Sequence, residues 1–146
     1  MNASQILASL ERERQLLREF RSLSEQQLAL LDVEDIEGVN HLLDQRADLM
    51  LEMTAIEATL GTWIDQVKAD PTVSNEMMTE LRAVNEEIVQ LANLVVDIDE
   101  QTHWRLDLIK TRSAEEMRSF NQGSNALTGY QRSFGTTNGT SLNYLS

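Results

Sequence analysis

Two short segments of the chain hold residue types whose spacing could support chemistry. Glu100 and His103 form an E-x-x-H motif, the spacing with which helical bundles bind a pair of iron ions, because side chains three residues apart share a helix face. A complete site needs a second such motif and two more glutamates. However, Glu37 and His41 are four residues apart, and no second E-x-x-H occurs. We therefore expect a solvated helix face here and no metal site.

The second segment is LVVDIDE, residues 94–100, which looks like a strand ending in the paired aspartates of a phosphotransferase. That chemistry needs a parallel strand, whereas helical apolar spacing runs through this segment. The chain also has no cysteine, no serine in a nucleophile turn near either histidine, and no phosphate loop, since neither lysine nor a helix follows GTTNG at 135–139. We expect a protein without catalytic activity and without a cofactor.

Helices must position these residues, because the alternating pattern of β-strands is nearly missing from the chain. The first helix is predicted over Ser4–Leu31, with a broad apolar face, and the charges of ERER at 11–14 are expected mostly on the solvated side. The second helix is predicted to start at about Val33, with Asp32 as its N-cap. It is predicted to end at Asp70-Pro71, because proline disfavours helical geometry in the preceding residue.

The second helix keeps a heptad repeat from Ile36 to Val67. Its core rows include two charged residues, Arg46 and Glu57. A further row at seven-residue spacing is fully apolar and consists of Leu42, Leu49, Ile56 and Trp63. Three rows make a face too wide for a two-helix seam, so we expect this helix to contact two others.

The third helix is predicted to follow a cap at Thr72 or Ser74. Its apolar residues alternate at spacings of four and three as far as Ile98 and then follow eleven-residue repeats to Phe120, which predicts a nearly straight distal half. A continuous helix over 74–120 would be about 70 Å long at 1.5 Å per residue. We therefore predict an all-α protein: an elongated antiparallel helical hairpin or three-helix coiled coil, with a very long third helix that projects past its partners and a polar C-terminal tail.

Trp104 lies well off the apolar stripe of the third helix, with Leu94 and Leu108 on the same side. We expect Trp104 to pack against the first helix. The alternative is that it belongs to an exposed patch that binds a partner.

The C-terminal end differs in composition from the rest of the chain, which predicts a helical domain over 1–122 and a flexible tail over 123–146. No acid occurs after Glu116, while four of the six glycines and four of the seven aromatic residues do. Apolar residues in the tail form two clusters, first Leu127, Tyr130 and Phe134 at i, i+3 and i+7, and then Leu142, Tyr144 and Leu145. Such spacing suits a segment that folds against a partner, the alternative being an inert extension.

Charge and hydropathy narrow the classes of partner. The net charge is -12, and such a field repels phosphate, so we expect no nucleic acid and no anionic membrane surface as partners. The N-terminus lacks the features of a signal peptide, and no run approaches the roughly 20 apolar residues of a membrane span. We expect a cytoplasmic protein without membrane insertion.

The chain resembles the FlgN-type flagellar export chaperones. The resemblance rests on four features: a small, acidic and helical chain, a second helix that begins with an aspartate and covers 32–60, a long third helix, and a polar tail in which Tyr130 is followed by Gly135. It implies a cytoplasmic chaperone that binds hook-filament junction proteins through their C-terminal helical segments, holds them unassembled and delivers them to the type III export apparatus. It also implies that the tail binds the client and that Tyr130 takes part in docking at the export gate.

A different class of function stays open beside this one. A structural coiled-coil scaffold or assembly subunit, with no client, would have the same helical periodicity, and its tail would serve only self-association. Whether the rod forms a homodimer is also left open.

Overall fold

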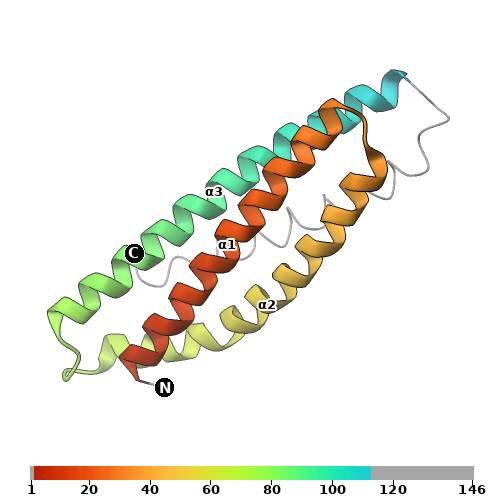
Figure 1. Ribbon diagram of the computed structural model, residues 1–146. Helices are drawn as coiled ribbons and strands as arrows, with labels where there is room; N and C mark the ends of the chain where they lie inside the picture. The colour runs from red at the N-terminus through yellow and green to blue at the C-terminus, as the bar shows by residue number, and fades with distance from the viewer. Residues whose placement is uncertain (1, 113–146) are drawn as a thin grey trace.

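Three α-helices make up the part of the chain that the computed structural model describes, residues 2–112. They are α1 (Ala3–Asp32), α2 (Ile36–Ala69) and α3 (Asn75–Arg112). Figure 1 shows an elongated rod in which α1 and α3 run in one direction and α2 runs in the other. Residues 2–112 contain no strand, and the predicted all-α fold is confirmed.

α1 is the central helix of the rod and lies between α2 and α3 (Figure 1). Its backbone packs against both neighbours, whereas α2 and α3 have no Cα atoms within 8 Å of each other. Apart from Leu16, the buried residues of α1 recur at alternating spacings of four and three: Ile6, Leu10, Glu13, Leu17, Phe20, Ser24, Gln27 and Leu31. The prediction that α2 contacts two helices therefore holds only through side chains, because its backbone packs on α1 alone.

The core consists of two apolar clusters on either side of a polar layer. The larger cluster occupies the end of the rod where α1 begins and includes Ile6, Phe20 and Ile88. The smaller one lies near the α1–α2 turn and includes Leu31 and Leu106. Each fully buried aliphatic or aromatic side chain contributes about 1.5–3 kcal/mol, so these clusters are the main source of stability. The residues between them are buried but polar: Ser24, Gln27, Arg46, Asp99 and Thr102.

The turn between α1 and α2 differs from the predicted one. α1 continues to Asp32, and Glu34 then adopts a left-handed backbone conformation with φ 54° that reverses the chain. The N-cap of α2 is Asp35, whose Oδ1 accepts a hydrogen bond of 3.0 Å from the amide of Gly38. The prediction that Asp32 caps a helix starting at about Val33 was therefore wrong. Asp32 instead pairs with Arg105 of α3 at 2.7 Å.

Substitution of the two aspartates should separate the cap from the surface ion pair. Asp35→Ala should lower the free energy of unfolding by about 1 kcal/mol, because the first turn of α2 loses its side-chain acceptor. Asp32→Ala should cost only a few tenths of a kcal/mol, since its ion pair with Arg105 is about half exposed. Urea denaturation of both variants measures the difference. A larger loss for Asp32→Ala would contradict the assignment of the cap.

α3 is the longest of the three helices, with 38 residues against 30 in α1 and 34 in α2. Ser74 caps it, as predicted, by accepting a hydrogen bond of 3.1 Å from the amide of Met77. At the other end Arg112 forms an ion pair with Glu34 in the α1–α2 turn, so the described part of α3 ends close to this turn. The predicted projection concerns residues 113–120, which lie outside the described part.

Burial along α3 corrects the predicted change of period at Ile98. Apart from Val84, the buried residues keep spacings of four and three along the described helix: Leu81, Asn85, Ile88, Ala92, Val95, Asp99, Thr102, Leu106 and Ile109. Asp99 occupies a core position that the apolar spacing skipped. The heptad therefore continues to Ile109, and the eleven-residue repeat is not what the described part of α3 follows.

Candidate functional site

Arg46 lies at the centre of the polar layer and connects all three helices. Its guanidinium is completely buried, and one of its terminal nitrogens donates to Oδ2 of Asp99 on α3 at 2.6 Å. The other terminal nitrogen donates to the Oε1 of Gln27 on α1. The guanidinium also lies over the ring of Phe20, 4.4 Å from the ring centre, a cation–π arrangement. This one side chain therefore bridges the gap between α2 and α3.

The polar layer is built to hold the helices together rather than to react. Burial raises the pKa of Asp99, and the charge and hydrogen bond of Arg46 act in the opposite direction. The hydroxyl of Ser24 donates to the carbonyl of Phe20 at 2.9 Å. Because Arg46 and Asp99 are both sealed from solvent, no external substrate can reach them. Their pairing across helices favours one register of α2 against α3.

A second buried charge site lies nearer the start of α1. Glu13 is only 1% exposed, although ERER was expected mostly on the solvated side. Burial, a hydrogen bond with Glu57 and the charge of Glu57 raise the pKa of Glu13 to about 10. Near neutral pH Glu13 is therefore protonated and serves as the donor to Glu57 on α2. The heptad rows had placed Glu57 in the core of the second helix, and it is half-buried.

The motifs that suggested chemistry lie on the helical surface or in the core of the rod. Glu100 is exposed, and the Nε2 of His103 lies 3.8 Å from Oδ2 of Asp107, one turn along the same helix. Within residues 2–112, no cluster of three or more His, Cys, Asp or Glu side chains could hold a metal ion. LVVDIDE is helical throughout, as predicted.

Trp104 projects from the outer face of α3 and does not pack on α1. Its side chain is 65% exposed, and Leu94 and Leu108 are 41% and 44% exposed. The expected packing against the first helix was wrong, because Trp104 is two residues from both Thr102 and Leu106. At 100° per residue, that separation places it opposite the buried face. The alternative, an exposed patch, is what the structure has, and we call Leu94, Trp104 and Leu108 the Trp104 stripe.

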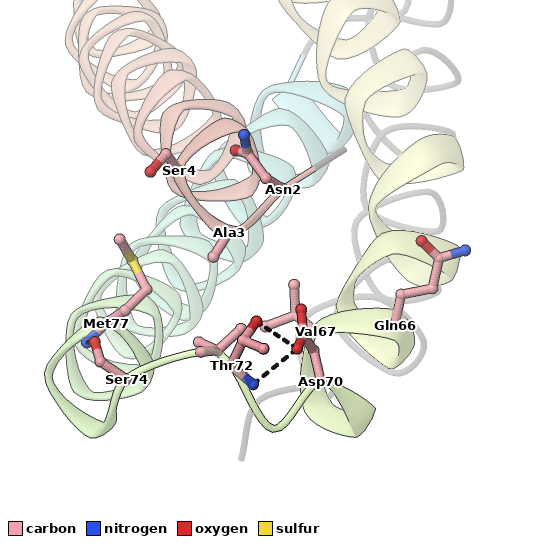
Figure 2. Close-up of a pocket in the computed structure, with 10 residues that line it drawn as sticks. Asn2, Ala3, Ser4, Gln66, Val67, Asp70, Thr72, Ser74 and Met77 are labelled. Atoms are coloured by element: carbon pink, nitrogen blue, oxygen red, sulfur yellow. Dashed lines mark hydrogen bonds between the residues drawn. The ribbon is translucent and has the colours of Figure 1, made fainter.

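A hollow of about 460 Å³ lies at the end of the rod where α1 begins (Figure 2). Four of its polar residues have structural roles: Asn2 caps α1, Ser74 caps α3, and Asp70 accepts hydrogen bonds from the hydroxyl and amide of Thr72 at 2.6 and 2.8 Å. These two hydrogen bonds lower the pKa of Asp70. The hollow is therefore a by-product of the turn and the caps, not a site for chemistry.

The six residues predicted to bind a client lie outside the described part of the chain. They are Leu127, Tyr130, Phe134, Leu142, Tyr144 and Leu145. Their role, and that of Tyr130 in docking, therefore stays a prediction.

The fold and the surface define the class of protein. It is an elongated three-helix coiled-coil rod whose surface, over residues 2–112, exposes charged side chains and a few large apolar ones. No helix in this part has the length and apolar character needed to cross a membrane.

Comparison with known proteins identifies the family. The family model described as FlgN protein matches residues 1–138, so the chain belongs to the FlgN family. FlgN proteins are flagellar export chaperones that bind export substrates, not enzymes, and the chain is accordingly a flagellar export chaperone. No curated protein and no solved structure matches the chain.

Proposed function

We propose that this chaperone binds hook-filament junction proteins in the cytoplasm, keeps them from assembling before export, and delivers them to the export gate. The observation that carries the proposal is the extent of the family match, which covers residues 1–138. It includes the rod and the first apolar cluster of the tail, Leu127, Tyr130 and Phe134. The second cluster, from Leu142 to Leu145, lies beyond the match, so the first cluster is the stronger candidate for the client site.

The distribution of apolar and charged residues also supports a tail that binds the client and a rod that keeps the complex in solution. A protein that polymerises through apolar helix faces aggregates when those faces are free, and an apolar segment that folds against them protects the protein. The rod has buried most of its own large apolar side chains, and over residues 2–112 only Val33, Leu51 and the Trp104 stripe stay exposed. The tail supplies the apolar cluster, and the acidic rod keeps the complex soluble.

Removal of residues 123–146 tests this proposal. The truncated chaperone should lose capture of a co-expressed hook-filament junction protein, while its helical circular dichroism stays nearly unchanged. Within the full chain, alanine at Leu127, Tyr130 and Phe134 together should weaken binding by about 30-fold or more, because buried aromatic anchors are each worth about 2 kcal/mol or more. The matched control is alanine at Leu142, Tyr144 and Leu145, which should weaken binding less.

Two results would count against the proposal. Unchanged client binding by the truncated protein would remove the tail from the client site. A change of oligomeric state on truncation, seen by sedimentation, with no client bound by either form, would favour the scaffold. Tyr130→Ala should in addition reduce binding to the export gate, which is measured separately with the client absent.

A further inference from the structure

The Trp104 stripe lies beside two carboxylates that form no ion pair with any residue of the described part of the chain. A shallow hollow of about 650 Å³ beside Trp104 is lined by Asp97, Glu100, Gln101 and Arg105 as well as by Trp104 itself. Asp97 and Glu100 take part in no ion pair within residues 2–112, whereas Arg105 is held by Asp32 on the α1 side. Trp104 therefore has two free acids beside it and leucines further along the same face.

These groups define the chemistry of what can cover the stripe. A guanidinium or ammonium group fits between a tryptophan face and a carboxylate, since both attract a cation. Apolar side chains beside that cation would cover Leu94 and Leu108. A second copy of this chain fits poorly through the same face, because it would bring Asp97 and Glu100 against their own equivalents, and the whole molecule carries a net charge of -12.

We propose that, when no client is bound, the Trp104 stripe is covered by the chain's own segment 117–134. This segment lies outside the described residues. It contains no acid, and it holds Arg118 beside Phe120 and Arg132 between Tyr130 and Phe134. Its charge and its apolar residues thus complement those of the stripe.

The length of the chain allows this contact. Arg112 is eight residues beyond Trp104, roughly 12 Å along the helix axis. The chain from Ser113 to Arg132 is 20 residues long and can span several times that distance. Because the segment is tethered, its effective concentration at the stripe is on the order of millimolar, so a weak contact is enough to cover Trp104.

The effect of client binding on the Trp104 stripe rests on the proposed function. Tyr130 and Phe134 would lie on the stripe in the free chaperone and on the client in the complex. Client binding would then release the stripe and expose Trp104, so the two bound states exclude each other.

The fluorescence of Trp104 tests the contact without any client. Trp63→Phe leaves Trp104 as the sole tryptophan of the full-length chain. Arg118→Glu with Arg132→Glu in this background should raise acrylamide quenching of Trp104 about twofold, because the segment is then repelled by Asp97 and Glu100. The matched control, Lys68→Glu with Arg82→Glu, reverses two exposed charges outside the stripe and should leave the quenching unchanged. Circular dichroism confirms that every variant is folded.

Exchanging the charges of the two partners separates their contact from other effects of the substitutions on Trp104. Adding Asp97→Arg and Glu100→Arg to the Arg118→Glu, Arg132→Glu chain should restore protection of Trp104. Quenching that is the same in all variants would overturn the proposal, and so would protection that depends on protein concentration, which would assign the stripe to a second copy. Addition of a hook-filament junction protein should raise the quenching to that of the charge-reversed chain. If the client binds and the quenching does not change, the inference fails while the proposed function stands.

Discussion

Replacing Arg46 by methionine should lower the free energy of unfolding by about 3–5 kcal/mol, because the substitution leaves the buried carboxyl of Asp99 without its cationic partner. The loss is a large share of the roughly 5–15 kcal/mol by which small domains are stable. Arg46 is also the side chain that joins α2 to α3, whose Cα atoms nowhere approach within 8 Å. Urea denaturation followed by circular dichroism measures the loss.

Removal of the whole ion pair is the matched control for this prediction. Arg46→Met combined with Asp99→Leu should recover most of the lost stability, since a buried pair replaced by apolar residues is often neutral or stabilising. A residual loss of about 1–3 kcal/mol is expected from Gln27, whose carbonyl loses its buried donor. If the double variant were no more stable than Arg46→Met alone, the cost would come from packing around Phe20 rather than from the unpaired charge.

The polar layer bears on the function of the rod. An all-apolar core tolerates sliding of one helix against another by a heptad, whereas Arg46 meets Asp99 and Gln27 in only one register. The structure of the rod thus fixes where the outer face of α3 and the end of the helix lie. For an export chaperone, a defined register presents the Trp104 stripe in a fixed position on the rod.

The three helices and most of their boundaries were predictable from the sequence, but the start of the second helix was not. The first helix was predicted over Ser4–Leu31 and occupies Ala3–Asp32. The second begins at Ile36 and not at about Val33. Asp32 and Asp35 are equally good caps by residue type, so residue type does not decide between them. In the structure α1 continues to Asp32, and Glu34 takes the left-handed conformation before the Asp35 cap.

The buried polar residues show why core positions were missed. Glu13 and Asp99 lie on heptad positions, but as acids they were interpreted as solvated charges or passed over. Arg46 and Glu57 appeared in the predicted core rows, since their apolar neighbours surround them in the repeat. A partner on another helix makes each burial tolerable, and such pairing across helices is visible only when the three helices are placed together.

The periodicity predicted the position of Trp104 around the third helix, but not its exposure. The angle of Trp104 from the core stripe was correct, yet it was expected on α1 because large aromatic residues are usually buried. Helical geometry places it opposite Thr102, on the face away from α1. For the tail, composition indicated an apolar, acid-free segment, but an interaction with another protein cannot be obtained from one chain's sequence alone.

The stability of the wild-type rod should fall as the pH rises through the neutral range because of Glu13. This carboxyl titrates near 4.5 in its ordinary state, and burial against Glu57 raises its pKa to about 10 in the folded protein. The folded state thus keeps a proton that the unfolded chain releases. The contribution of Glu13 is complete below the unfolded pKa and is lost as the pH rises toward the folded pKa.

Glu13→Gln should remove this pH dependence, because the amide keeps a donor toward Glu57 and does not titrate. The difference in free energy of unfolding between variant and wild type should grow in favour of the variant by up to about 1.4 kcal/mol per pH unit. Urea midpoints at several pH values between about 6 and 9 measure this difference, in which the two histidines and other shared groups cancel. Glu25→Gln, which alters an exposed pair with Arg21 on the same helix, should run parallel to wild type.

Parallel profiles for wild type and Glu13→Gln would mean that water reaches Glu13 and that it titrates like a surface acid. The predicted slope arises because burial and the neighbouring Glu57 disfavour a negative charge on Glu13, whose Oε1 also has no hydrogen-bond partner among residues 2–112. Arg46 and Asp99 supply opposite charges to each other at the other polar site of the core. Glu13 and Glu57 would repel each other if both were ionised, and their contact is therefore stable only while Glu13 keeps its proton.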